Sequence, residues 1–146
     1  YLSGHNDLRA QHGAAPLSWS EDLQDKAQSY ADSCHFAHSD GALGPVGENL
    51  GAGTGTFTAE EAVAQFATDE SQFDPTHETF SHFTQMVWKS TTQLGCASAI
   101  CGGIFDAQFG PATYHVCLYN PVGNVVGQER LVNSQIVSMS ANQSII

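Results

Sequence analysis

The chain has 146 residues, and its 15 acidic residues far outnumber its 4 lysines and arginines, which gives a formal net charge of -11. A chain of this length is expected to form one domain that buries roughly two thirds of its extended surface. The acidic balance provides no positive surface for phosphate groups, so nucleic acid and anionic membranes are poor partners. A divalent cation or a neutral apolar ligand is electrostatically easier to bind.

The cysteines form an even set without a Cys-x-x-Cys pair, namely Cys34, Cys96, Cys101 and Cys117. This arrangement favours two disulfides over a zinc site or a redox motif, and leaves three pairings open. We therefore expect an oxidising, extracellular compartment. No apolar run approaches the ~20 residues of a membrane span, and the absence of a signal peptide before Tyr1 fits a trimmed secreted protein.

Residues 2–11 are predicted to form the first helix, which Gly13 and Pro16 end. His5 and Asn6 lie in this helix and could be mistaken for catalytic residues. Buried hydrogen bonding is the preferred interpretation, because helix starts commonly bond to neighbouring loops.

A second helix is expected after Ser20, which is a favourable N-cap, and its apolar residues recur at helical spacing as far as Cys34. The glycine-rich stretch 40–58 cannot form a regular helix. We expect a loop there, with one short extended piece around residues 48–50.

Thr58 and Glu61 have the spacing of a capping box and predict a third helix that runs to about Glu70. Asp69 and Glu70 would lie at its C-terminal end, where negative charge opposes the helix dipole. That placement invites a functional explanation, although a solvated acidic pair is an equally ordinary reading.

The next segments combine aromatic residues with a histidine. In the loop 71–80, Phe73 and Phe80 are either lids on the core or part of an apolar ligand surface. The stretch 81–91 is predicted to be helical, with His82 in its first turn. Taken alone, a histidine in such a place is more often a packed core residue than a ligand.

Two strands, 94–100 and 113–120, are predicted around a Gly102-Gly103 turn, and they are expected to pair in antiparallel fashion. Residues 128–146 are predicted to be an extension, either an edge strand or a docked tail. Asn142 begins an Asn-x-Ser pattern, which is weak evidence for a glycan.

Three stretches of the sequence resemble the CAP superfamily, which comprises cysteine-rich secretory proteins, antigen 5 and pathogenesis-related-1 proteins. The run from His82 to Trp88, followed by Thr91, is similar to its first signature, and residues 114–124 are similar to its second. Residues 5–19 look like its amino-terminal region. The resemblance covers residues 1–127, the expected CAP domain, and looks closest to fungal secreted pathogenesis-related-1-like proteins.

The resemblance implies a fold of the α+β class, a three-layer α-β-α sandwich with a central antiparallel sheet and one large cleft. It also implies disulfides between Cys34 and Cys101 and between Cys96 and Cys117.

The resemblance places four polar residues in that cleft. His38, Glu48 and His82 match the family positions, whereas Asp69 replaces a glutamate and is one methylene shorter. Two imidazoles and two carboxylates suit a divalent cation, zinc above all, which the fold would not require.

Family members are known as non-catalytic binders of sterols and of fatty acids, the latter in a groove between helices. The sterol-contacting loop of such members corresponds to residues 72–83, so Phe73, Phe80 and Phe83 are the predicted lipid contacts. An effector or defence protein that binds a host or microbial protein is the alternative. A metal-assisted hydrolase is a weaker one, because the sequence has no Gly-x-Ser-x-Gly elbow and no spare thiol, and no catalytic residue is predicted.

Overall fold

The computed structural model describes residues 1–74, 76–77 and 79–128. The predicted extension after residue 128 and the glycan acceptor Asn142 lie outside the described residues. Among the described residues, no helix is long and apolar enough to cross a membrane.

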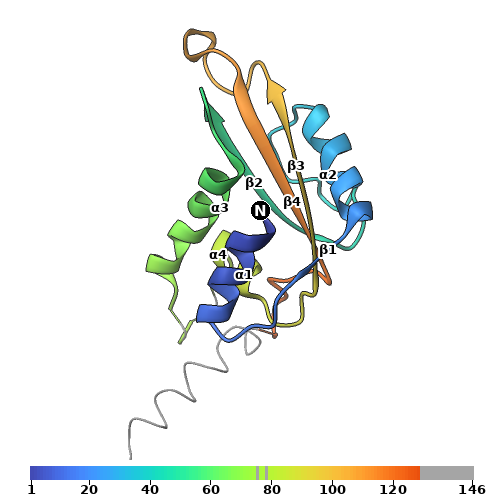
Figure 1. Ribbon diagram of the computed structural model, residues 1–146, viewed down its shortest axis with the longest axis vertical. Coiled ribbons are helices and arrows are strands. Elements are labelled where there is room, and N and C mark those ends of the chain that lie inside the picture. Colours follow the sequence, from blue (N-terminus) through green and yellow to red (C-terminus); the bar gives the residue numbers. More distant parts are fainter. Residues whose placement is uncertain (75, 78, 129–146) are drawn as a thin grey trace, which may run out of the picture.

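A four-stranded sheet in the order β1-β3-β4-β2 forms the middle layer of the molecule (Figure 1). Its strands are β1 (Ser18–Trp19), β2 (Gly47–Thr54), β3 (Gln93–Cys101) and β4 (Ala112–Asn120). β4 is antiparallel to β2 and to β3, as expected, whereas the short β1 pairs in parallel with β3. β2 is therefore one edge of the sheet.

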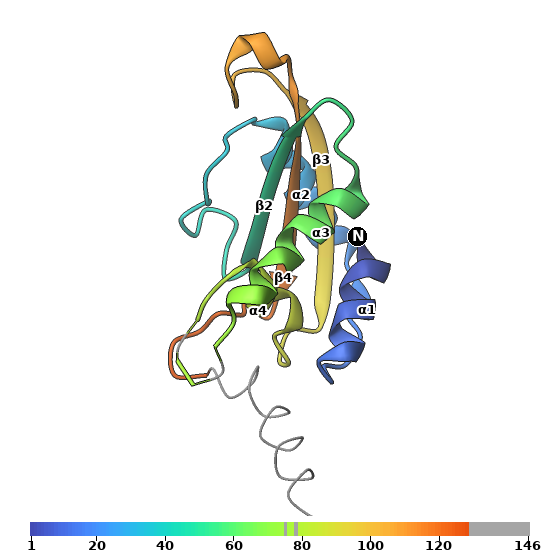
Figure 2. The same ribbon diagram turned by 90° about the vertical axis from the view of Figure 1, so that its left-hand side faces the viewer.

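Helices cover both faces of the sheet, which makes the α-β-α sandwich that the resemblance implies. They are α1 (Leu2–Gln11), α2 (Glu21–Asp32), α3 (Ala59–Ala67), α4 (His82–Val87) and the short 3-10 helices η1 (Thr68–Gln72) and η2 (Ala107–Phe109). α2 covers one face alone, while α1, α3 and α4 gather on the other (Figures 1 and 2).

Each face of the sheet has its own apolar core. Under α2, Leu23 and Ala27 pack against Val116 and Leu118 of β4. α2 lies so close to β3 that a Cβ atom on Gly95 would collide with the backbone of Gln24. On the other face, the core includes these buried side chains of α3, α4 and the sheet: Phe66, Phe83, Met86, Val87, Leu94 and Tyr119.

Two predicted helix caps are confirmed. The Ser20 hydroxyl accepts the Leu23 backbone N–H at 3.3 Å, and both bonds of the Thr58 and Glu61 capping box form. The third helix, however, was predicted to run to Glu70, and α3 ends three residues earlier. The chain there tightens into η1, which carries Asp69.

The extended piece predicted for residues 48–50 is too short, because β2 is a regular strand of eight residues. Every one of them pairs with β4, from Gly47 opposite Tyr119 to Thr54 opposite Ala112. Pairing with a partner strand thus outweighs the poor strand propensity of glycine, which is a weak and context-dependent preference.

The predicted helix of residues 81–91 also differs, because α4 ends at Val87. Arg9 of α1 explains this end. Its buried guanidinium donates hydrogen bonds to the carbonyl oxygens of Met86, Trp88 and Thr91 at 2.9–3.0 Å. These carbonyls are satisfied by a side chain instead of by a further helical turn.

The two disulfides join the pairs that the resemblance implies. Cys34 and Cys101 tie the end of α2 to the end of β3, and Cys96 and Cys117 link β3 to β4. In the chain-entropy model, each bridge contributes about 3 to 4 kcal/mol of stability.

Candidate functional site

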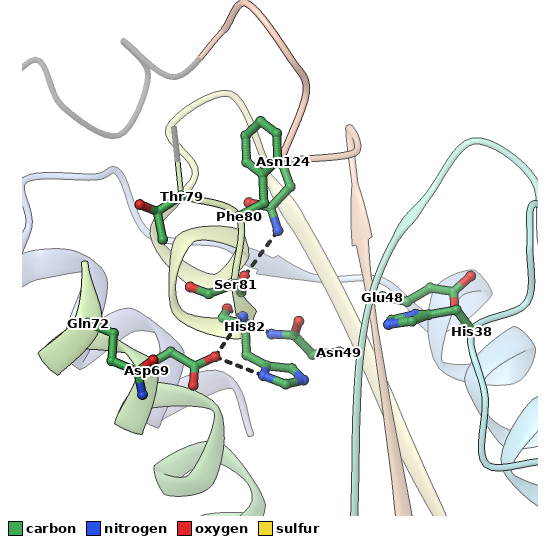
Figure 3. A pocket seen from close by; sticks show the side chains of 10 residues that line it. All are labelled: His38, Glu48, Asn49, Asp69, Gln72, Thr79, Phe80, Ser81, His82 and Asn124. Carbon is green, nitrogen blue, oxygen red and sulfur yellow. Dashed lines mark hydrogen bonds and ion pairs between the residues drawn. The ribbon is translucent and has the colours of Figure 1, made fainter. Parts of the chain in front are cut away.

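All four predicted cleft residues line one cavity of about 430 Å³, which we call the central cleft. His38 and Glu48 come from the loop after α2 and from β2, while Asp69 and His82 come from η1 and α4. Figure 3 shows that they form two separate pairs, one on each side of β2.

His82 and Asp69 form the first pair. The Asp69 carboxylate accepts the His82 Nδ1–H at 2.9 Å and the His82 backbone N–H at 3.1 Å. In a neutral imidazole with this tautomer, the lone pair lies on Nε2. The imidazole also stacks on Phe66, with ring centroids 5.5 Å apart. The shorter aspartate side chain therefore reaches the histidine and fixes its orientation.

His38 and Glu48 form the second pair, with Nδ1 and Oε2 3.2 Å apart. Glu48 also accepts the Ser39 backbone N–H at 3.0 Å and the Ser39 hydroxyl. Its carboxylate is only 9% exposed, whereas the His38 side chain is 62% exposed. Glu48 thus anchors the loop, and His38 faces solvent.

The strand β2 separates the two pairs because successive side chains of a strand point to opposite faces. Glu48 points toward the α2 face, and Asn49 toward the α4 face (Figure 3). Within the described part of the chain, no group of three or more His, Cys, Asp and Glu side chains could hold a metal ion. The donor types suit zinc, but in this arrangement they do not fit a single four-ligand site.

Asn49 is a site residue that the sequence analysis missed. Its Nδ2 donates to the His82 carbonyl oxygen and to the Tyr119 hydroxyl, both at 3.0 Å. Tyr119 in turn bonds to Nε2 of His5 at 2.7 Å, and His5 Nδ1 donates to the Tyr1 carbonyl oxygen. The alternation of β2 is the signal that would have placed Asn49 behind His82.

His5 is a buried structural residue, as the sequence predicted. Asn6 is partly buried and bonds to the backbone of Leu17. Burial lowers the pKa of His5 to about 4, so its ring is neutral at physiological pH. A neutral ring is what the two hydrogen bonds require, because one nitrogen donates and the other accepts.

The three phenylalanines predicted to contact lipid have different environments. Phe80 is 40% exposed and lines the central cleft. Phe83 is fully buried in the core, and Phe73 packs edge-on against it, with ring centroids 5.6 Å apart. Phe83 therefore has no surface for a ligand in this structure, because it fills the space between α4 and its neighbours.

A second cavity of about 480 Å³ continues from the central cleft and shares Asp69 and His82 with it. We call it the aromatic extension. Its walls include Phe36 and Phe105, which are 47% and 40% exposed, and Leu50 and Ala52 of β2 also line it. The sequence analysis did not predict this cavity, because Phe105 belongs to the loop between β3 and β4, far along the chain from Phe36.

A third cavity, of about 390 Å³, lies between α1 and α3, and we call it the helix groove. Its apolar lining consists mainly of Leu8, Val63, Ala64, Ala67 and Met86. Gly4 lets the two helices approach, because a Cβ atom there would lie 2.9 Å from Val63 Cγ1. Asp7 and Glu60 lie among the polar residues of the groove, and no Lys, Arg or His side chain of the described residues lines it.

The fold, the two bridges and the paired histidines and acids together define a CAP domain. The chain belongs to the cysteine-rich secretory protein family, CAP, whose family model matches residues 2–119.

Two curated proteins illustrate the relationship. The fruiting body protein SC14 of Schizophyllum commune is 37% identical over 93% of this chain and 66% of its own length. The pathogenesis-related leaf protein 6 of Solanum lycopersicum is 38% identical over 88% of this chain and 79% of its own length. The chain thus spans a little under two thirds of SC14.

Among solved structures, the crystal structure of NaASP2 with Zn2+ has a TM-score of 0.64 and is 22% identical. The similarity covers 87% of this chain and 80% of the NaASP2 chain. This likeness supports the fold.

Proposed function

We propose that this protein is an extracellular binding protein that holds a small apolar molecule in the helix groove and does no chemistry on it. The observation that carries the proposal is the apolar lining of a cavity of about 390 Å³ between α1 and α3. The CAP resemblance, which implies binding of sterols and fatty acids, supports the same reading. The two disulfides support an oxidising compartment.

Burial of an alkyl chain would supply the binding energy. Each methylene removed from water contributes about 0.8 kcal/mol, so about eight buried methylenes contribute roughly 6 kcal/mol before the entropic cost of binding. A sterol ring system offers similar area in a rigid form, which lowers that cost.

The charges of the groove select the head group. Asp7 and Glu60 lie beside the apolar wall, and none of the described residues adds a basic side chain to the lining. A fatty-acid carboxylate would meet like charge there, whereas a hydroxyl would not. We therefore expect a neutral alcohol or sterol to bind more tightly than the fatty acid of equal chain length.

The test is equilibrium binding of radiolabelled hexadecanol, cholesterol and palmitate to the wild type and two matched variants. Ala64→Phe fills the groove from an exposed position, and Ala10→Phe adds the same ring on the exposed side of α1. We expect at least a tenfold loss of hexadecanol affinity in Ala64→Phe and no change in Ala10→Phe. Palmitate should bind more weakly than hexadecanol.

A third variant separates the groove from the loop of Phe80. If Phe80→Ala abolishes uptake while Ala64→Phe leaves it intact, the ligand occupies the central cleft and the groove assignment is wrong. If none of the three lipids binds to the wild type, the proposal of lipid binding fails altogether.

A further inference from the structure

The free edge of the sheet, β2, lines the central cleft, and the pattern of hydrogen bonds in the sheet shows which of its backbone groups face outward. Cys96 and Cys117 are opposite each other on β3 and β4, with Cα atoms 4.1 Å apart. In antiparallel pairs, Cα atoms about 4.5 Å apart mark residues that do not hydrogen-bond to each other, and bonded pairs lie about 5.5 Å apart. The backbone groups of Cys117 therefore point to β2, where Asn49 is their partner.

The alternation of a strand then fixes the rest of β2. Because Asn49 bonds to β4, the N–H and C=O groups of its neighbours Glu48 and Leu50 point away from the sheet, as do those of Ala52 and Thr54. Within the described residues, these outward groups have no backbone partner. Each such residue offers one donor and one acceptor.

Three of the features with which proteins usually protect a free strand, namely lysine, proline and a β-bulge, are missing from this edge. Its sequence, from Gly47 to Thr54, contains neither lysine nor proline. The register with β4 continues through all eight residues without a bulge. A regular and unprotected edge is a template for the addition of another strand.

The outward groups coincide with the cavities. Glu48 lines the central cleft, and Leu50 and Ala52 line the aromatic extension, which joins it at Asp69 and His82. Figure 2 shows β2 between α3 on one side and the loop of residues 33–46 on the other. The residues that line the two cavities place both of them along this edge of β2.

We propose that the central cleft and its aromatic extension bind an extended peptide, which adds to β2 as a further strand of the sheet. Successive side chains of this peptide would point alternately to the two walls. One set would meet Asp69 and His82, and the other would meet His38 and Phe36.

The lining of the two cavities selects basic and apolar side chains. Their acidic side chains are Glu48 and Asp69, and no lysine or arginine of the described residues lines either cavity. The whole chain carries 15 acidic against 4 basic residues. Phe36, Phe80 and Phe105 supply exposed rings for apolar side chains. The partner is therefore a basic peptide with apolar residues at alternate positions.

The probe is an acetylated, amidated heptapeptide of alternating lysine and leucine. It is long enough to pair with residues 48–52, which span roughly 17 Å of strand at about 3.3 Å per residue. Hydrogen exchange followed by NMR reads the edge directly on the wild-type protein. We expect the peptide to slow exchange of the Leu50 and Ala52 amides at least tenfold, while the already bonded Asn49 and Gly51 amides change little. Binding without protection at Leu50 and Ala52 would overturn the proposal.

Two peptide controls test the chemistry. The same peptide with glutamate in place of lysine should bind at least tenfold more weakly at low salt. The peptide with every internal amide N-methylated should not bind, because its backbone donors are gone. Equal binding of either control overturns the proposed mode.

A pair of protein variants tests the edge itself. Ala52→Pro removes an outward N–H without removing a bond to β4, a placement that edge strands tolerate. We expect at least a tenfold loss of peptide affinity. Thr54→Pro makes the same change at a residue that lines neither cavity and should alter affinity less than twofold. Equal losses in the two variants would contradict the proposal.

Two further outcomes separate this proposal from its neighbours. Protection of Leu50 and Ala52 that rises with protein concentration, without peptide, would mean that a second copy occupies the edge, and the peptide proposal would be wrong. Ala64→Phe blocks the helix groove only, so it should leave peptide binding unchanged, and the two proposals fail independently.

Discussion

The central cleft and the helix groove both use a side chain of α4: His82 lines the cleft, and Met86 lines the groove. The two cavities are nevertheless built in different ways. The groove arises where two helices present small and apolar side chains to each other. The cleft arises where a strand edge meets two His–acid pairs from remote segments. Helix packing thus makes an apolar site from side chains, whereas a sheet edge makes a polar site largely from backbone.

Removal of Arg9, which holds the end of α4, should damage both cavities and have the largest effect on stability. Arg9 is fully buried and donates four hydrogen bonds, to the carbonyl oxygens of Ala15, Met86, Trp88 and Thr91. Arg9→Met leaves these buried acceptors without a partner, so the free energy of unfolding should fall by about 3 to 5 kcal/mol. Urea denaturation measures it.

The matched control for this prediction is Lys26→Met, which removes an exposed cation that donates a 3.4 Å hydrogen bond to the Leu43 carbonyl oxygen. It should change the free energy of unfolding by no more than about 0.5 kcal/mol. A loss below about 1 kcal/mol in Arg9→Met would show that the arginine does not hold α4 in place.

The hydrogen-bonded chain behind His82 should respond to acid. Burial lowers the pKa of His5 to about 4, below its ordinary value of 6.5. Between these values the unfolded chain binds a proton that the folded chain does not. The contribution of His5 to the free energy of unfolding is therefore fully present above pH 6.5. It decreases as the pH drops toward 4, by on the order of 3 kcal/mol in total. Burial also lowers the pKa of His115, which acts in the same direction.

His5→Gln isolates the contribution of His5, because glutamine does not titrate and the other groups remain. We expect the free energy of unfolding, measured in urea at several pH values, to depend less steeply on pH in the variant between pH 6.5 and 4. Parallel curves for the two proteins would refute the assignment.

A change confined to the cleft should lower the free energy of unfolding less than the changes at Arg9 and His5. Asp69→Ala removes the acceptor of the His82 Nδ1–H, and because this pair is partly exposed the loss of stability should stay within about 1 kcal/mol. The imidazole ¹⁵N spectrum should show Nδ1 protonated in the wild type and a changed tautomer in the variant. Glu70→Ala, an acid that contacts His12 instead, should leave the His82 signals unchanged.

Zinc should distinguish two half-sites from one four-ligand site. Each His–acid pair offers two of the four ligands that zinc takes, so we expect weak binding with a stoichiometry of two. His38→Ala and His82→Ala should each remove one half-site, as measured by isothermal titration of metal-free protein. One tight site per chain that either variant abolishes would contradict the separation of the pairs.

Local signals in the sequence predicted the parts of the fold that depend on neighbours along the chain. The caps at Ser20 and Thr58 and the strand β4 follow from adjacent residues. The cleft residues His38 and His82 came from family resemblance, since nothing local joins such remote segments.

The parts that the sequence did not predict depend on pairing and packing at long range. The full length of β2 follows from its partner β4, and the burial of Phe83 follows from how α4 docks. The helix groove requires α1 and α3 to meet at Gly4 and Val63, which are far apart in the chain. No local pattern carries that information.

The most direct test of the central claim is a map of amide chemical shifts on addition of hexadecanol. We predict that the shifts concentrate at Leu8, Ala64 and Ala67 in the helix groove, while Asn49 and Leu50 at the cleft stay unchanged. Shifts concentrated at Asn49 and Leu50, with Leu8 and Ala64 unaffected, would contradict the assignment of the apolar ligand to the groove.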